Sequence, residues 1–297
     1  MTEHSRARLG LITAAAIFST GGAAIKLTSL TGVQVACARS GIAAIAVLLL
    51  APESRRGWTW RTAVASIAYA ACLTLFVLAN KLTTSANTIF LQAAAPLYLL
   101  LLGPWLLKEP VKRSDLGVLA IMALGFVVVF LGTAPPARTA PNPALGNILA
   151  ALSGVAWAFL VIGLRWLGKA EANAGHEAPS PTTAVVLGNL LAAFVTLPFI
   201  FPVVAVSAAD IATVLFLGIV QIAIAYMLMS RALKHVGALE ASILLMVEPA
   251  LNPIWSWLMH GETPGFWSLS GGALILGATL LKGALDTRSE TVTPAAA

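Results

Sequence analysis

Residues 85–110 read SANTIFLQAAAPLYLLLLGPWLLKEP, and this stretch decides the fold class. From residue 86 to residue 106 it contains no charged side chain, and Pro96 stands near the middle of that run. About 20 consecutive apolar residues are the length that an α-helix needs to cross the hydrocarbon core of a bilayer. Lys108 and Glu109 end the run. The stretch therefore predicts a transmembrane helix with a proline at mid-depth.

The whole chain has the same apolar character. Of its 297 residues, 59% are hydrophobic and only 10% are charged, against about 25% charged residues in a typical soluble domain. The mean hydropathy is +0.89. A soluble fold of this size needs more polar cover, which excludes a cytosolic enzyme, a nucleic-acid-binding protein and a disordered scaffold. Cys37 and Cys72 both fall in apolar runs, so no disulfide framework and no metal site is expected.

Ten such apolar runs follow one another, and the positive charges orient them. If the N-terminus faces the cytoplasm, fourteen of the 18 lysines and arginines fall on the inner side and three, Lys26, Lys81 and Arg138, on the outer side. Because cytoplasmic loops carry the excess of Lys and Arg, both termini are predicted to be cytoplasmic, which requires an even number of spans. The expected transmembrane helices are 9–27, 33–51, 62–80, 86–106, 115–133, 145–165, 183–204, 211–230, 239–259 and 266–284.

An internal repeat divides the chain into two halves. Three residues recur at an offset of 153: Lys81 as Lys234, Pro96 as Pro249 and Glu109 as Glu262. Each half holds five spans, an odd number, so the second copy crosses the membrane in the opposite sense, as in many secondary transporters. The predicted division is a first five-helix repeat at 1–133, an external linker at 134–144, a second five-helix repeat at 145–284 and a disordered C-terminal tail at 285–297.

The repeated prolines point to the centre of the molecule. In inverted-repeat transporters the substrate site lies near the bilayer midplane, and interrupted helices at matching positions mark it. Proline removes a backbone N–H and frees a carbonyl, which kinks a helix. We interpret Pro96 and Pro249 as hinge or gating positions. The alternative is that they only shape the packing of their helices.

Glu248 is the acidic residue that the span map places near the midplane. A carboxylate at that depth costs about 2.5–3.5 kcal/mol on insertion scales, so such residues usually face a cavity. Two functional interpretations follow: Glu248 binds an ammonium group of the substrate, or it carries a coupling proton. The structural alternative is that it hydrogen-bonds backbone groups loosened by Pro249.

Two basic residues are expected near the outer side. Arg39 lies within the second span, about a third of the way in, and Lys26 ends the first span. Together they would attract an anionic substrate or a carboxylate. The alternatives are a helix-packing role for Arg39 and anchoring at the interface for Lys26.

The other candidates for a substrate cavity are polar or aromatic side chains inside the spans. Gln92 lies one helical turn before Pro96, and Ser19 and Thr20 interrupt the first span next to Gly21 and Gly22. Each polar group in lipid needs a partner or a cavity, and bonds between helices are the default. The aromatic candidates, which would stack against an aromatic substrate or else pack in the core, are Phe18, Phe76, Tyr98, Trp157 and Tyr226.

Four pieces of sequence carry a family resemblance: AIKL at 24–27, VQVACARSGIAAIAVLLL at 33–50, the stretch at 85–110, and ALKHVGALEASILLMVEPALNPIWSWLMHGETP at 232–264. Their order and doubling resemble the EamA-type domain of the drug/metabolite transporter superfamily. Within it the chain looks most similar to bacterial aromatic amino-acid exporters of the YddG type. It departs from the family pattern at Phe18-Ser19, where Trp-Gly is usual, and at Lys108-Glu109, which replaces one Gly-Glu.

The resemblance implies a secondary transporter of a bacterial inner membrane that exports amino acids, aromatic or other neutral ones, or similar small metabolites by alternating access. Its partners would be the small-molecule substrate and the lipid bilayer, without nucleic acid, cofactor or metal, and proton coupling stays open. The alternative is a carrier of other small metabolites or drugs. A membrane-embedded enzyme is disfavoured because the four histidines fall in tails, loops or span ends. A channel is disfavoured because no ring of charge or filter motif is visible.

Overall fold

The computed structural model describes residues 2–106, 113–171, 181–203, 205–232, 235–236 and 238–292. Within these ranges every regular element is a helix, apart from one isolated β-bridge between Ala137 and Ala140. The expectation of an all-helical protein is confirmed for this part of the chain. The repeat partners Glu109 and Lys234 lie outside the described residues.

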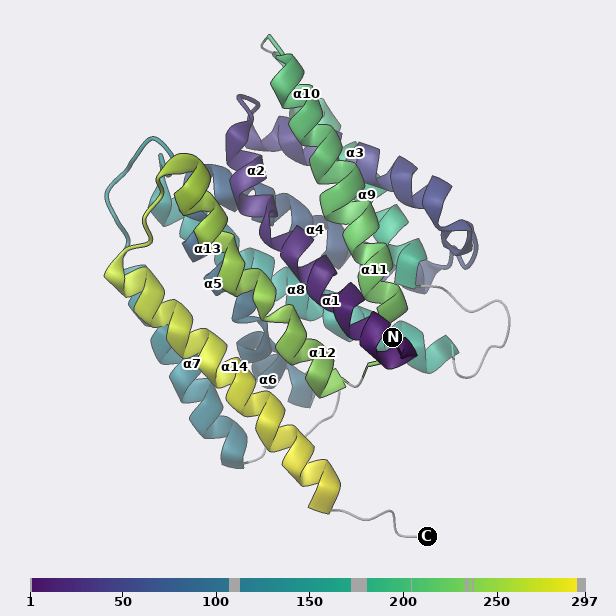
Figure 1. The fold of residues 1–297 in the computed structure, drawn as a ribbon, viewed down its shortest axis with the longest axis vertical. Helices are drawn as coiled ribbons and strands as arrows, with labels where there is room; N and C mark the ends of the chain where they lie inside the picture. The colour runs from purple at the N-terminus through teal and green to yellow at the C-terminus, as the bar shows by residue number, and fades with distance from the viewer. Residues whose placement is uncertain are drawn as a thin grey trace.

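The helices follow the order expected from the apolar runs (Figure 1). Those of the first half are α1 (Glu3–Ser19), α2 (Gly21–Leu27), α3 (Gly32–Leu50), η1 (Pro52–Arg55), α4 (Trp60–Leu82), α5 (Ser85–Ala93), α6 (Ala95–Leu106) and α7 (Arg113–Leu131). Those of the second half are α8 (Pro143–Glu171), α9 (Pro181–Thr196), η3 (Leu197–Phe199), α10 (Ala208–Leu215), η4 (Phe216–Ile224), α11 (Ala225–Ala232), α12 (Ala238–Leu245), α13 (Val247–His260) and α14 (Phe266–Val292).

Among the described residues, 8 helices are long and apolar enough to cross a membrane. The apolar part of α7, Asp115–Leu131, is shorter than this length, and α12 and α13 are separate helices. A count of ten spans therefore stays a prediction. Helices of this length and composition satisfy their own backbone groups in lipid. The described chain is therefore that of a membrane protein.

Two long helices are broken just before the repeated prolines. α5 gives way to α6 at Ala94, with Pro96 two residues later, and α12 gives way to α13 at Met246, with Pro249 three residues later. Proline has no N–H to donate and disfavours a helical conformation in the residue before it. The two prolines of the repeat thus stand at matching breaks.

The first membrane helix is broken without a proline, where α1 meets α2 at Thr20. Ser19 Oγ donates to the Ala16 carbonyl at 2.6 Å, and Thr20 Oγ1 donates to the Ile17 carbonyl at 2.7 Å. Hydroxyls that bond back to the preceding turn in this way bend helices. At Gly21, next in the chain, an added Cβ would lie 2.7 Å from Gln221 Nε2, so close packing accounts for this glycine.

The helix pairings are reciprocal between the two halves (Figure 1). α4 packs along α8, and α11, the counterpart of α4 in the second half, packs along α1. α3 lies against α9, and α7 lies against α14 at one edge of the molecule. The first two contacts are the same contact with the halves exchanged, and each of the others joins an element to its own counterpart. Two copies of one unit that pack about a pseudo-two-fold axis give this pattern.

A buried ion pair closes one end of the bundle. Lys26 Nζ lies 2.8 Å from Glu262 Oε2, and the two side chains are 4% and 5% exposed. Glu262 Oε1 also accepts the backbone N–H of Ser85, the first residue of α5, at 2.6 Å. A carboxylate is favourable there because the first turn of a helix carries partial positive charge. Glu262 thereby joins the second half of the chain to α2 and α5 of the first half.

The segment 285–297 differs from the expected disordered tail. α14 is helical as far as Val292, and residues 293–297 lie outside the described part. Between Gly283 and Pro294 the sequence has no glycine or proline to end the helix, and several of its residues favour helix.

The crossing of α7 and α14 generates a stability prediction. An added Cβ at Gly271 would lie 2.5 Å from the backbone oxygen of Gly125, whereas one at Gly277, on the same helix, would meet nothing within 4 Å. We expect Gly271→Ala to lower the free energy of unfolding by about 1–3 kcal/mol, because backbone must move. We expect Gly277→Ala to be neutral or stabilising, since alanine favours helix over glycine by about 1 kcal/mol. Thermal unfolding of the purified protein in detergent measures both, and equal effects would contradict the crossing.

The Lys26–Glu262 pair generates a second prediction. Lys26→Met leaves the Glu262 carboxylate buried without its cationic partner. Breaking a buried ion pair in this way costs about 3–5 kcal/mol. The double variant Lys26→Met/Glu262→Gln keeps an acceptor for the Ser85 N–H without a buried charge. It should recover most of the thermal stability that the single variant loses. If both variants unfold at the same temperature, the unpaired Glu262 carboxylate does not cause the loss of stability.

Candidate functional site

A cavity of about 280 Å³ lies where the broken pairs α5–α6 and α12–α13 meet α1, α3, α4, α8, η4, α11 and α14. Ligand pockets typically enclose about 300–1,000 Å³, so this cavity suits a small molecule. Most of its lining is apolar. The polar residues among those that line it are Arg39, Cys72, Gln92, Gln221, Tyr226, Glu248 and Thr279.

The cavity brings together many of the residues singled out from the sequence. The cavity candidates that line it are Phe18, Phe76, Gln92, Trp157, Tyr226 and Glu248, and Pro96, Pro249 and Arg39 line it with them. Ser19, Thr20, Tyr98 and Lys26 are not among the lining residues. Arg39 and Lys26, grouped from the sequence as outer-side basic residues, are therefore separated. Arg39 faces the cavity, and Lys26 is held in the ion pair with Glu262.

Ser19, Thr20 and Tyr98 have structural partners. The hydroxyls of Ser19 and Thr20 bond to their own helix, and Ser19 Oγ accepts the Trp255 indole N–H at 2.9 Å. The Tyr98 ring packs edge-on against Phe126, with 6.4 Å between ring centroids. These contacts give the two hydroxyls and the Tyr98 ring structural roles.

The sequence did not single out several apolar lining residues. Leu73 precedes Phe76 by three residues on α4, and Ile222 and Met229 lie four before and three after Tyr226. Residues three or four apart share one face of a helix. Helical spacing from Phe76 and Tyr226 would have predicted that these residues line the same cavity.

Each proline leaves one carbonyl of its helix without the usual donor, because proline has no backbone N–H. In an unbroken helix Pro96 would pair with the carbonyl of Gln92, and Pro249 with that of Leu245. Gln92 and Leu245 both line the cavity. Each break therefore lies beside a residue of the cavity wall.

Gln92 is fixed by a polar cluster on one side of the cavity. Its Nε2 donates to Ser153 Oγ at 2.7 Å and to Cys72 Sγ at 3.4 Å. Ser153 Oγ in turn donates to the Cys72 carbonyl at 3.3 Å. The cluster ties α5 to α4 and α8, as expected for interhelical bonds in lipid. Gln92 thus combines a structural role with a position on the cavity wall.

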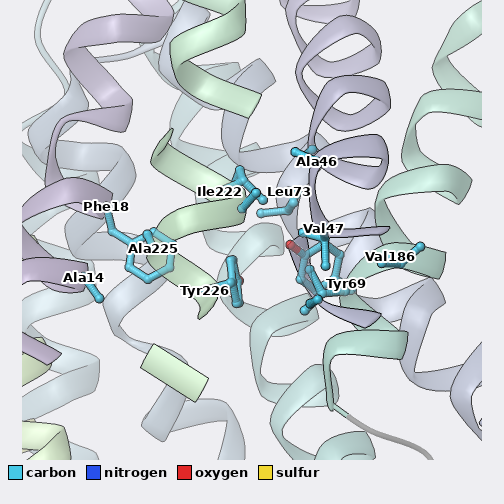
Figure 2. Close-up of a cluster of buried hydrophobic side chains, with 14 of the residues drawn as sticks. Ala14, Phe18, Ala46, Val47, Tyr69, Leu73, Val186, Ile222, Ala225 and Tyr226 are labelled. Carbon is cyan, nitrogen blue, oxygen red and sulfur yellow. The ribbon is translucent and has the colours of Figure 1, made fainter. Parts of the chain in front are cut away.

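Phe18 and Tyr226, which line the cavity, belong to a row of aromatic side chains (Figure 2). Tyr226 lies between Phe18 and Tyr69, with ring centroids 5.0 Å from Phe18 in an edge-to-face arrangement and 5.7 Å from Tyr69. Asn189 Nδ2 donates to the Tyr69 hydroxyl at 3.1 Å, which holds the far end of the row. Trp157 packs against the same cluster. Edge-to-face pairs of this kind are favourable beyond the area they bury.

Two opposite charges face the cavity without a partner in the described chain. Arg39 is only 2% exposed, and its Nε and Nη1 have no hydrogen-bond partner among the described residues. Glu248 is in the first turn of α13, where the helix restarts after Met246. No ion pair or hydrogen bond of Glu248 is found in the ranges that the structure describes, including with Arg39. The expected alternative, in which Glu248 bonds to backbone loosened by Pro249, is not seen there.

The side chains that line the cavity are suited to binding a ligand. The cavity offers one cationic group, one acidic group and a large apolar surface. No cluster of three or more His, Cys, Asp or Glu that could hold a metal occurs in the described ranges. A buried, unpaired charge is costly unless a ligand supplies the opposite charge.

Comparison with known proteins gives the family. The EamA-like transporter family matches this chain at residues 6–131 and again at residues 144–282. A crystal structure of a protein 20% identical in sequence has the same fold, with a TM-score of 0.63 over 96% of this chain and 99% of that chain.

Two relatives carry the word transporter in their names. The "Uncharacterized transporter YdfC" of Bacillus subtilis (strain 168) is 40% identical over 65 residues, which are 22% of this chain and 21% of the relative. An "Uncharacterized transporter" of Archaeoglobus fulgidus is 29% identical over 206 residues, which are 69% of this chain and 70% of the relative. The first match spans only about a fifth of the relative's length. Because the family match extends over most of both halves, this integral membrane protein belongs to the EamA-like transporter family.

Proposed function

We propose that the protein is a secondary transporter that exports amino acids, aromatic or other neutral ones, or similar small metabolites across a bacterial inner membrane. The observation that carries the proposal is the position of the cavity. It lies between two helices that are broken at matching places in the two halves, and it is lined by Arg39 and Glu248, which form no ion pair within the described residues. Discontinuous helices near the midplane frame the substrate sites of many such carriers.

The proposed architecture is two inverted five-helix repeats with both termini in the cytoplasm. In it, α7 and the pair α12–α13 also cross the membrane and bring the number of spans to ten. The reciprocal helix pairings and the double family match support this arrangement. The predicted excess of positive charge on the inner side supports its orientation.

Alternating access requires that the two ends of the cavity open in turn. Two ionic contacts link the first membrane helix to the region of α12 and α13. Lys26 pairs with Glu262 at one end, and at the other Arg8 pairs with Glu240, which also lies 3.5 Å from His4 Nε2. The Arg8 and His4 side chains are 53% and 47% exposed, so this end is weakly held compared with the buried Lys26–Glu262 pair. We propose the breaks at Thr20, Ala94 and Met246 as the hinges.

Proton coupling is proposed as an additional property of Glu248. A carboxylate without a partner is able to bind either a proton or an ammonium group. The titratable or charged groups that share the cavity with it are Arg39 on α3, Cys72 on α4 and Tyr226 on α11. A carrier of drug-sized molecules is the other candidate, and the volume of about 280 Å³ favours a smaller substrate.

Flux in proteoliposomes tests the function. Purified protein is reconstituted into liposomes loaded with a panel of radiolabelled neutral and aromatic amino acids, with and without a pH gradient. We expect saturable efflux of at least one amino acid above that of protein-free liposomes. Glu248→Gln should lower this flux at least about tenfold, because a charge-assisted hydrogen bond of about 1.5–3 kcal/mol is lost. Glu53→Gln, the same change at an exposed residue, is the matched control.

Two outcomes would contradict the account. If no amino acid shows selective flux, the substrate assignment is wrong. If the Glu248→Gln protein still responds to the pH gradient as the unchanged protein does, Glu248 is not the proton carrier.

A further inference from the structure

The cavity presents its two charges separately. Arg39, on α3, and Glu248, on α13, line one cavity, yet no nitrogen of Arg39 lies within 4.0 Å of a Glu248 oxygen. A guanidinium stays charged under all ordinary conditions, so Arg39 does not escape the cost of burial by losing its proton. The two charges balance each other in sign but leave each other's hydrogen-bonding groups unused.

The N–H groups of Arg39 and the carboxylate of Glu248 indicate which chemical groups a ligand would carry. Two N–H-bearing nitrogens of Arg39, Nε and Nη1, are buried without an acceptor among the described residues. A carboxylate oxygen accepts a charge-assisted hydrogen bond from a guanidinium N–H, which is stronger than a bond between neutral groups. Glu248 offers only acceptors when it is ionised, which suits the three N–H donors of an ammonium group. A single ligand that carries both groups satisfies both residues at once.

The rest of the wall describes the remainder of that ligand. Phe18, Trp157 and Tyr226 contribute aromatic surface next to these charges. While Glu248 is ionised, a purely anionic ligand would leave it unpaired and repelled, and a purely cationic ligand would do the same to Arg39. An uncharged ligand would pair with neither.

We propose that Arg39 and Glu248 bind the carboxylate and the ammonium group of one zwitterionic substrate, whose apolar side chain lies against Phe18, Trp157 and Tyr226. This inference rests on the proposed function and specifies its substrate class: α-amino acids with an apolar side chain. Arg39 and Glu248 are then specificity-determining residues, because each excludes substrates that lack one of the two charged groups.

Binding of matched ligands to the purified protein tests the proposal without any variant. The probes are L-phenylalanine, L-phenylalaninamide, which lacks the carboxylate, and 3-phenylpropionate, which lacks the ammonium group. L-leucine, leucinamide and 4-methylpentanoate form a second series. In at least one series we expect the zwitterion to bind at least about tenfold more tightly than both analogues, because a buried charge is left unpaired otherwise. Absence of this preference in both series would overturn the proposal.

Variants assign each charge to its residue. Arg39→Gln should weaken binding of the zwitterion at least about tenfold. It should also shift the preference toward the amide, because the cavity then lacks the buried cation that pairs with a carboxylate. Glu248→Gln should weaken it similarly and shift the preference toward the carboxylate analogue. Arg231→Gln and Glu53→Gln make the same charge changes at exposed positions and should leave all affinities unchanged.

The shift in preference separates recognition from folding. A variant that is merely misfolded loses affinity for all three ligands of a series in equal proportion, and that result would overturn the assignment of the charge. The flux experiment distinguishes failure of this inference from failure of the proposed function. Transport of a metabolite without zwitterion preference would refute the pairing and leave the transporter intact. Absence of flux of every amino acid tested would refute the amino-acid substrate of the proposed function.

Discussion

The hydrocarbon core of a membrane offers no water to a charge or to a backbone polar group, and the structure depends on this constraint. Most of the polar groups described above satisfy it inside the protein. Lys26 pairs with Glu262, Asp115 accepts from Lys282 at 2.9 Å, and Gln92 bonds to Ser153. Arg39 and Glu248 have no such partner in the described chain, although they lie where partners are most needed. Among the described residues that line the cavity, these two therefore offer charged groups to a ligand.

The same constraint explains why the broken helices surround the cavity. A break leaves backbone groups without helical partners, and these are tolerated at membrane depth only where protein or a polar cavity receives them. At the break between α1 and α2, Gln221 Nε2 donates to the Phe18 carbonyl at 3.3 Å, and Trp255 reaches Ser19. At the other two breaks, Gln92 and Leu245 lie on the cavity wall. The helix breaks and the candidate binding site thus lie together in one arrangement.

Much of the architecture was predictable from the sequence, because the length of apolar runs and the rarity of charge carry it. The matched prolines predicted the breaks near Ala94 and Met246, and mid-span depth predicted the position of Glu248 in the cavity. The direction in which each side chain faces was less accessible. A helix that is apolar all round has no polar face to show which side is buried. For this reason Arg39 was assigned to the outer side, and Ser19 and Thr20 to the cavity, although their hydroxyls bond to their own helix.

The central claim is that this cavity is the transport site and that it recognises both ends of an amino acid. A crystal structure of the protein grown with L-4-bromophenylalanine tests it most directly, because bromine gives an anomalous signal that locates the side chain. The account predicts a bromine peak beside Phe18, Trp157 and Tyr226, with the carboxylate on Arg39 and the ammonium group on Glu248. A peak outside the cavity, or an amino acid in the reverse orientation, would contradict it.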